Sequence, residues 1–230
     1  MPNLSLRLKT IASLVPDGAR VCDIGTDHGY LAIELKSSGK ASSVIAADIN
    51  PLPLKNAFEN IKKSGVRDIE LRLCDGLTGI DKDEVDTIII AGMGGEVIAG
   101  IIKNSIKTAK SDKRIILQPT TSPEFLRRFL YSNGFEIKNE TPVFENGKIY
   151  SVMLVYKSLK NEEKPEYFYY IGKLLPSDDA GILYIKKQLE RCRKCALSLK
   201  NVPSKQEDYI YYNNIANDIE NYLNTYISED

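Results

Sequence analysis

The first part of the chain alternates between apolar runs and segments of helical periodicity. The runs RVCDIG, SVIAAD, IELRLC, VDTIIIAG and RIILQP start at residues 20, 43, 69, 85 and 114. VDTIIIAG and RIILQP are apolar on both faces, as parallel strands covered by helices on both sides must be. Between them lie helical patterns, two of which open with Asn50-Pro51 and Ser122-Pro123, since proline is tolerated in the first turn of a helix. The alternation predicts a doubly wound α/β sheet.

The sheet is expected to end in an antiparallel hairpin. FEIKNETPVFENGKIYSVMLVYK, residues 135–157, holds two strand-like runs around Asn146-Gly147, which is a strong hairpin signal. At the other end, Leu4, Leu8, Ile11 and Val15 predict a short amphipathic helix that precedes the first strand. Residues 1–157 therefore form the first predicted domain.

The remainder of the chain has no strand pattern. We interpret SLKNEEKP, residues 158–165, as a linker because it is charged, polar and ends in proline. Heptad-like apolar positions then follow, at Ile182, Ile185, Leu189, Cys192, Ala196 and Leu199 and at Tyr212, Ile215, Ile219, Tyr222 and Tyr226. This spacing predicts an antiparallel helical hairpin with a coiled-coil-like seam over residues 166–230.

Charge and hydropathy exclude several classes of protein. Lys plus Arg and Asp plus Glu both number 31, so any nucleic-acid contact has to come from local patches. The N-terminus lacks the pattern of a secretory signal, and the longest apolar stretch, residues 85–102, contains Asp86, Glu96 and four glycines. We therefore expect a soluble cytoplasmic protein without a membrane span.

The four cysteines do not indicate a metal centre. Cys192 and Cys195 form a CxxC, but zinc would need two further ligands, and the sequence has no second pair and no histidine cluster. A redox CxxC normally opens a helix after a strand, whereas this one lies deep in a helical pattern. We interpret both as ordinary helix residues and expect no metal.

DIGTDHGY, residues 23–30, falls at the turn after the first predicted strand, where α/β sheets bind their ligands. A dinucleotide site requires G-x-G-x-x-G, but here Asp27 and Tyr30 occupy the second and third glycine positions. A carboxylate repels a pyrophosphate and attracts a cation. The turn therefore favours S-adenosylmethionine, which carries a sulfonium and an ammonium group, over NAD.

Three further positions agree with this cofactor. Asp48 ends the second strand, where a carboxylate can bind ribose hydroxyls, and Asp75-Gly76 follows the third, where it could accept from the adenine amino group. AGMGGE, residues 91–96, follows the fourth strand, where glycines let backbone approach a flat base. Taken singly, each has a structural alternative: turn glycines at Gly25 and Gly29, a helix cap at Asp48, an ordinary turn at Asp75.

The combination of DIGTDHGYL, AADIN, CDG, IIIAGMGGEVIAGII and LQP resembles the TrmK-type bacterial tRNA (adenine-N1)-methyltransferases over essentially the whole chain. The resemblance implies a class I methyltransferase fold and a helical hairpin after the sheet. It also implies methyl transfer from S-adenosylmethionine to N1 of adenine 22 in tRNA. Its motifs suggest a cofactor site made of Asp23, Gly25, Asp27, His28, Asp48, Ile49, Asp75, Gly76, Ala91 and Gly92.

The chemistry calls for positioning and charge compensation, because N1 of adenine has an available lone pair. Asp27 is the first candidate to face the positive charge that builds on the ring, although it could instead hold the methionine ammonium or organise the turn. Met93, Gly94 and Gly95 are expected to form the floor under the target base. His28 is the only histidine, and we favour a role in bonding the loop over a proton shuttle.

Two basic stripes are candidates for binding the tRNA backbone. Lys103, Lys107 and Lys110 share one predicted helix face, and the first hairpin arm carries Lys186, Lys187, Arg191, Arg193, Lys194 and Lys200. The second arm holds six acids and only Lys205, so the two arms could instead neutralise each other. Arg7 and Lys9, on the first helix, are weaker candidates.

Two alternatives remain open from the sequence alone. One is a methyltransferase of a small molecule or protein whose hairpin serves dimerisation, and the other is a cofactor-sensing or RNA-binding module without catalysis. The oligomeric state also stays open, with a monomer favoured.

Overall fold

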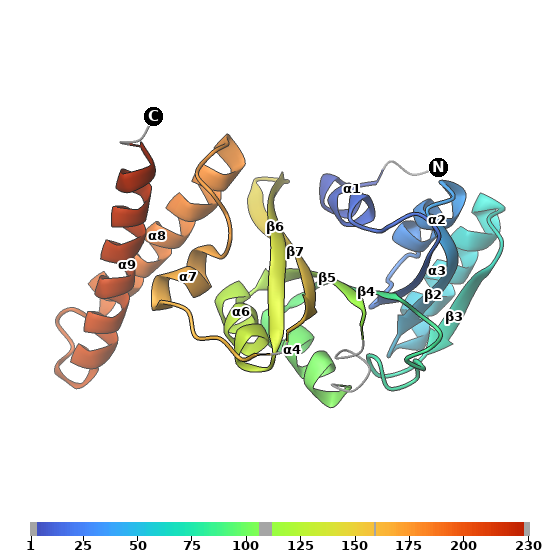
Figure 1. Ribbon diagram of the computed structural model, residues 1–230, viewed down its shortest axis with the longest axis horizontal. Helices are drawn as coiled ribbons and strands as arrows, with labels where there is room; N and C mark the ends of the chain where they lie inside the picture. Colours follow the sequence, from blue (N-terminus) through green and yellow to red (C-terminus); the bar gives the residue numbers. More distant parts are fainter. Residues whose placement is uncertain (1–3, 106–111, 159, 228–230) are drawn as a thin grey trace. The chain divides into compact units, whose positions relative to one another are not determined.

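The computed structural model describes residues 4–105, 112–158 and 160–227, and these divide into two compact units between Glu162 and Glu163. The first unit is built on a mixed sheet with flanking helices (Figure 1). Its strands are β1 (Ala19–Ile24), β2 (Ala41–Asp48), β3 (Ile69–Leu73), β4 (Thr87–Gly94), β5 (Arg114–Thr121), β6 (Phe135–Glu145) and β7 (Lys148–Lys157). Its described helices are α1 (Leu6–Ser13), α2 (Tyr30–Ser37), α3 (Pro51–Ser64), α4 (Gly95–Asn104) and α6 (Pro123–Ser132).

The sheet has the order β3-β2-β1-β4-β5-β7-β6. Strands β1 to β5 pair in parallel, whereas β7 runs antiparallel between β5 and β6. The order reverses beside β1, because the chain goes outward to β2 and β3 and then returns to β4 on the other side. The predicted doubly wound sheet closed by a hairpin is confirmed, and the switch point lies between β1 and β4.

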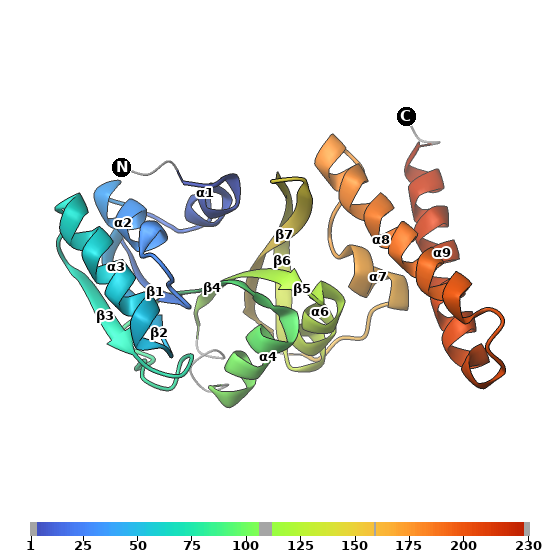
Figure 2. The ribbon, with the colours of Figure 1, turned by 180° about the vertical axis from the view of Figure 1, so that it is seen from behind.

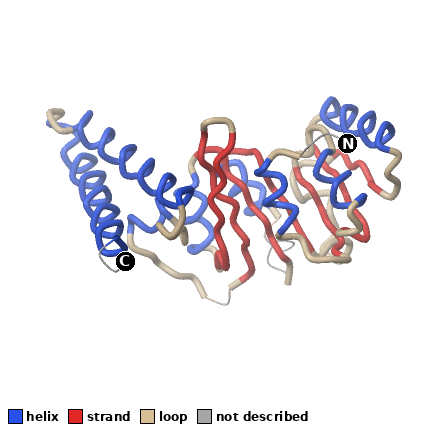
Figure 3. Tube along the Cα trace, turned by 90° about the horizontal axis from the view of Figure 1, so that it is seen from above, coloured by secondary structure: helices blue, strands red, loops and turns tan. Residues whose placement is uncertain are grey.

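Both faces of the central strands are buried, as their sequences predict. In β4, Ile89 joins a core cluster with α1 and α2, while its neighbours Ile88 and Ile90 point to the opposite face and are also fully buried. Helices α1 and α3 each contact α2, and α4 contacts α6, so the helices form two groups around the sheet (Figures 2 and 3).

Local sequence explains where the elements begin and turn. Helix α2 starts after Gly29, which has a left-handed backbone with φ of 69°, and α3 starts at Pro51. The β6–β7 hairpin turns at Asn146 and Gly147, whose φ values of 51° and 73° are those of a tight hairpin turn.

The second unit is helical. Helices α8 (Asp179–Leu199) and α9 (Gln206–Ile227) lie side by side (Figure 1), joined through a 3-10 turn at Pro203–Lys205. Their core includes Ile185, Leu189 and Cys192 from α8 and Ile215 and Ile219 from α9, which confirms the predicted seam. A short helix, α7 (Glu166–Ile171), packs on both and was not predicted. Its six residues, EYFYYI, are too few to show a helical period.

No helix in the described ranges is long and apolar enough to cross a membrane. Within the same ranges, no group of three or more His, Cys, Asp or Glu side chains is placed to hold a metal ion.

Candidate functional site

A cavity of about 390 Å³ opens at the carboxyl ends of β1, β2, β4 and β5. Its wall contains nine of the residues that the sequence nominated, namely Arg7, Asp23, Gly25, Asp27, His28, Asp48, Ala91, Gly92 and Met93. Six others complete it: Leu8, Thr26, Gly29, Tyr30, Leu31 and Gln118. The nominated residues Ile49, Asp75, Gly76, Gly94 and Gly95 lie outside this wall. Ile49 follows β2, and Gly94 and Gly95 stand at the junction of β4 and α4, whereas Asp75 and Gly76 follow β3, whose end does not line the cavity.

The first turn follows β1 and is tied to β2 through its backbone. The N–H groups of Gly25 and Thr26 both donate to the carbonyl of Ala47, at 2.8 and 3.1 Å. Gly25 has a φ of 80°, and a Cβ there would lie 2.1 Å from Cε of Met93. The backbone conformation therefore favours glycine at this position, and a larger residue would also have to displace the flexible end of Met93.

Asp23 lies beneath this turn and is buried. Burial, with a smaller contribution from the negative charge of Asp48, raises the pKa of its carboxyl to about 6, although a hydrogen bond with the Thr26 side chain opposes the rise. A cationic ligand in the cavity would stabilise the ionised form of Asp23 and lower this pKa. The site is therefore electrostatically suited to a positive group.

Asp27 and His28 stand at the mouth of the turn. His28 Nε2 lies 3.1 Å from Asp27 Oδ2, and the side chains are 47% and 67% exposed for His28 and Asp27, respectively. The His28 ring stacks on Tyr30 with centroids 5.3 Å apart, and its carbonyl accepts a hydrogen bond from Asn60 at 3.0 Å. Because Asp27 stays exposed, its carboxylate is available to a ligand at the cavity.

Asp48 is only partly engaged by the protein. Its Oδ1 accepts from the Asn50 N–H at 2.8 Å, just before α3, while Oδ2 has no hydrogen-bond partner in the part of the chain that the structure describes. The side chain of Asp48 does not cap α3 directly. One oxygen therefore remains for a ligand hydroxyl.

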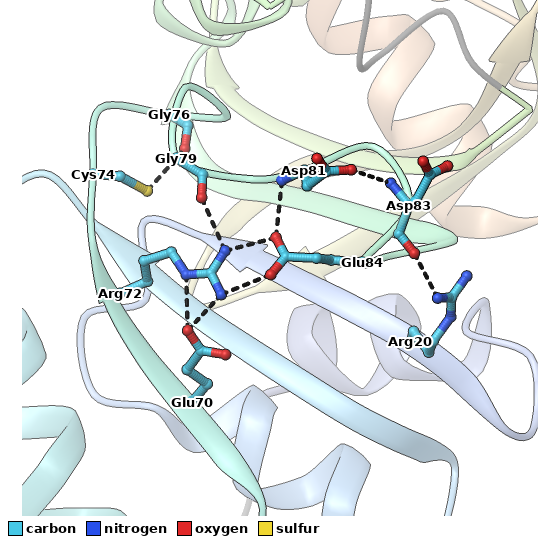
Figure 4. A network of polar contacts seen from close by, with 9 residues as sticks. All are labelled: Arg20, Glu70, Arg72, Cys74, Gly76, Gly79, Asp81, Asp83 and Glu84. Carbon is cyan, nitrogen blue, oxygen red and sulfur yellow. Dashed lines mark hydrogen bonds and ion pairs between the residues drawn. The ribbon is translucent and has the colours of Figure 1, made fainter.

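The turn with Asp75 and Gly76 is held in place by a polar network behind it (Figure 4). The Arg72 guanidinium donates to the Gly79 carbonyl at 2.9 Å, to Glu84 at 2.8 Å, and to Glu70. Arg72 also lowers the pKa of the Glu84 carboxyl through these hydrogen bonds. A Cβ on Gly76 would lie 2.8 Å from Cγ2 of Ile101, so this turn packs closely against α4.

The second turn, residues 92–95, comprises the last residues of β4 and the first residue of α4, and it is fixed by side chains and backbone of the neighbouring strand. Gly92 donates its N–H to Gln118 Oε1 at 3.1 Å, and the Met93 carbonyl accepts from Thr120 Oγ1 at 3.0 Å. A Cβ on Gly95 would lie 2.3 Å from the Ser122 carbonyl oxygen. The turn is therefore rigidly seated against the end of β5.

Gln118 is the residue that the sequence reasoning missed. It is fully buried, and its Oε1 accepts from Gly92 and also from Arg7 Nη1 at 2.9 Å, while its Nε2 donates to the Pro119 carbonyl at 2.8 Å. The signal that could have found it is a polar side chain inside RIILQP, an otherwise apolar run.

The described residues that were nominated for RNA contact lie on three helices, α1, α4 and α8. Lys9, Lys103 and Lys186 are exposed on α1, α4 and α8, and Lys107 falls outside the described residues. Arg7 lies in the wall of the cavity, and its side chain is mostly buried. Arg193 of α8 forms an ion pair with Glu220 of α9 at 2.6 Å. At this position the two hairpin arms neutralise each other, which was the alternative to RNA contact that the sequence allowed.

Comparisons with known proteins place this geometry in a family. A protein-family model described as "Methyltransferase domain" matches residues 4–153. The tRNA (adenine(22)-N(1))-methyltransferase of Bacillus subtilis (strain 168) is 40% identical over 152 residues, which are 66% of this chain and 64% of that relative, slightly less than two thirds of its length.

Solved structures agree over nearly the whole chain. The crystal structure of the B. subtilis m1A22 tRNA methyltransferase TrmK superposes with a TM-score of 0.85 at 27% identity, covering 95% of this chain and 99% of that one. The structure of M. capricolum TrmK in complex with the cofactor product S-adenosyl-homocysteine gives a TM-score of 0.81 at 28% identity, covering 97% and 99% of the two chains.

Proposed function

We propose that this chain, which belongs to the methyltransferase family, transfers a methyl group from S-adenosylmethionine to N1 of adenine in tRNA. Position 22 is the proposed target, because the relatives described above are named for that position. A tRNA substrate implies a cytoplasmic protein.

The observation that carries the proposal is the acidic cavity at the switch point. Asp23, Asp27 and Asp48 line it from the first two strand ends, and the first turn and the end of β4, at Gly92 and Met93, line it as well. This charge pattern suits a ligand with a sulfonium and an ammonium group and opposes a pyrophosphate. Gly25 leaves room for Met93 and for a ligand that lies against the backbone.

Roles for the cavity residues follow from where the strand ends place them. Asp48 has a free oxygen for the ribose hydroxyls, and Asp23 lies where it can face the ammonium group. Ile49 and Asp75 follow β2 and β3, at the same carboxyl edge of the sheet. Ile49 is exposed and can cover a flat adenine, and the Asp75 carboxylate can accept a hydrogen bond from the adenine amino group. When bound, S-adenosylmethionine supplies a methyl group that the N1 lone pair of adenine can take without a general base.

The second turn and Asp27 then serve the target base. Met93, in the cavity wall, with Gly94 beside it offers a backbone surface against which a base can rest. Gly95 is buried, so it supports this surface from behind and does not touch the base, contrary to the expectation from the sequence. The exposed Asp27 carboxylate compensates the positive charge that N1 methylation leaves on the ring. N1 must first be freed from base pairing, so the tRNA is expected to open locally at the site.

Exposed lysines supply the contacts to the tRNA backbone in this proposal. Lys9 and Lys103 lie on the unit that holds the cavity, and Lys186 lies on α8. Among the described residues Lys186 has no acidic partner, whereas Arg193 is paired with Glu220. Lys186→Ala is therefore expected to weaken tRNA binding and its salt dependence more than Arg193→Ala does.

Incubation with methyl-labelled S-adenosylmethionine and unmodified bulk tRNA tests the proposal. Digestion of the RNA should release the label as 1-methyladenosine, and primer extension should stop at position 22 when wild-type protein is used. Label in another nucleoside would contradict the base assignment. Cofactor binding without transfer to any RNA would favour a small-molecule or protein substrate, or a module without catalysis.

A further inference from the structure

Arg7 is the only Arg or Lys among the described residues that line the cavity. Its guanidinium is held in place on several sides: Nη1 donates to Gln118 at 2.9 Å, Nε lies 3.4 Å from Glu145 Oε2, and the ring of Tyr150 lies 5.3 Å from Cζ. The Arg7 side chain is 25% exposed. A guanidinium has five N–H donors, so these contacts leave some of them for a ligand.

The charges of the cavity wall are arranged with a polarity. The strand ends run in the order β2, β1, β4, β5, which places Asp48 and Asp23 at one end and Gln118 at the other. Arg7 reaches the Gln118 end from α1. A ligand that carries both charges must therefore place its cationic groups near the aspartates and its anionic group near Arg7.

We propose that Arg7 binds the carboxylate at the methionine end of S-adenosylmethionine, an inference that rests on the proposed function for its ligand. A guanidinium held by Gln118 and Glu145 is oriented before the ligand arrives, so little side-chain entropy is lost on binding. Gln118 Oε1 accepts hydrogen bonds from both Arg7 and the Gly92 N–H, so it positions the carboxylate-binding guanidinium relative to the end of β4.

The carboxylate can be tested separately from the rest of the cofactor. Calorimetry would compare S-adenosylmethionine with decarboxylated S-adenosylmethionine on wild type, Arg7→Met and Arg7→Lys. Arg7→Met should weaken S-adenosylmethionine about 10- to 100-fold, the usual value of a charged hydrogen-bonded pair, and should change the decarboxylated analogue less than about threefold. Arg7→Lys should retain part of the affinity, because a lysine keeps the charge without the planar fork.

Lys62→Met is the control, because Lys62 is an exposed cation on α3, lies outside the cavity wall and has no proposed role in binding tRNA. It should leave both affinities unchanged. The melting temperature of each variant without ligand would show whether α1 still packs.

Other outcomes would overturn the inference in recognisable ways. An equal loss for both ligands would mean that Arg7 acts only by holding Gln118 and Glu145. Unchanged cofactor binding with weaker tRNA binding and a shallower salt dependence would make Arg7 a phosphate contact. Failure of the wild type to bind either ligand would remove the proposed function as well, whereas cofactor binding without tRNA methylation would remove only the substrate assignment.

Discussion

The two glycine turns at the cavity are held in different ways. The first, residues 25–29 after β1, is tied by its backbone to β2 and leaves Asp27 and His28 exposed toward a ligand. The second, residues 92–95 where β4 passes into α4, is hydrogen-bonded by Gln118 and Thr120 and packed against the backbone at Ser122. One turn thus presents charge, and the other is a fixed surface.

The difference also appears in what an added methyl group would meet. At Gly25 it would meet the flexible end of Met93, which can move, whereas at Gly95 it would meet a main-chain carbonyl, which cannot move without shifting β5. We therefore expect changes in the second turn to cost stability and changes in the first turn to cost ligand binding.

The largest effect is expected from Gly95→Ala. Its Cβ would lie 2.3 Å from the Ser122 carbonyl oxygen, so the free energy of unfolding should fall by about 3 kcal/mol, the upper end of overpacking. Gly100→Ala is the control, because it lies in the same helix with nothing within 4 Å, and it should stabilise by about 0.5–1 kcal/mol. Urea unfolding measures both, and equal stabilities would refute the rigid seating of the second turn.

A comparable effect is expected from pH at the first turn. Since the folded protein raises the pKa of Asp23 to about 6 from an ordinary value near 3.8, the Asp23 proton stabilises the fold below about pH 4, and this contribution is lost as pH rises through 6. Asp23→Asn removes the dependence, so its stability relative to wild type should rise by about 3 kcal/mol between about pH 4 and pH 7.5. Urea unfolding across this range without ligand would test it, and a constant difference would contradict the raised pKa.

Gln118→Met should cost about 2 kcal/mol, because it removes the buried amide of Gln118 and leaves the N–H of Gly92 and one donor of Arg7 without their acceptor. Methyl transfer should fall about 10- to 100-fold if the second turn is the floor of the target base. Gln118→Glu keeps both acceptor contacts and should retain more activity. Similar losses in the two variants would show that the amide acts through its bond to Pro119 instead.

Gly25→Ala should cost about 1–2 kcal/mol in stability, the price of a left-handed backbone for a residue with a Cβ. Gly39→Ala is the control, because Gly39 also has a positive φ but no atom lies within 4 Å of its Cβ position. Its loss of stability therefore measures the cost of the left-handed backbone alone. Only Gly25→Ala should weaken S-adenosylmethionine, by displacing Met93 into the cavity, and Met93→Ala in the same chain should restore part of the binding. Equal affinities for Gly25→Ala and Gly39→Ala would mean that Met93 has room to move.

The same contrast explains how much could be predicted from the sequence. The sheet, its hairpin and the helical seam follow from patterns that local chemistry enforces, such as the two-faced apolar run of β4 and the Asn146-Gly147 turn. Asp27 and Asp48 could be nominated because strand ends of a parallel sheet meet at one edge, and Asp23 through the motif that resembles the family. The first turn was therefore predictable as a motif.

The partners of the second turn were not predictable in this way. Gln118 lies 26 residues from Gly92, and its contact depends on the register of β4 and β5, in which Gln118 stands opposite Ala91. Arg7 reaches the cavity only because Glu145, 138 residues away, fixes its backbone and side chain. From sequence, an arginine on an amphipathic helix is typical of a surface contact, and its placement in the cavity wall required the tertiary structure.

The smallest effect is expected from Thr120→Val, which compares the two side chains that hold the second turn, Thr120 and Gln118. It removes one hydrogen bond, from Thr120 Oγ1 to the Met93 carbonyl, and should cost about 1 kcal/mol because the hydroxyl is only partly buried. Thr121→Val is the control, since Thr121 is exposed and its hydroxyl makes no hydrogen bond within the described ranges. If Thr120→Val lowers methyl transfer as much as Gln118→Met does, the turn is held by its carbonyl as firmly as by the Gly92 N–H. A loss confined to a few tenths of a kcal/mol would leave Gln118 as the principal support of the turn.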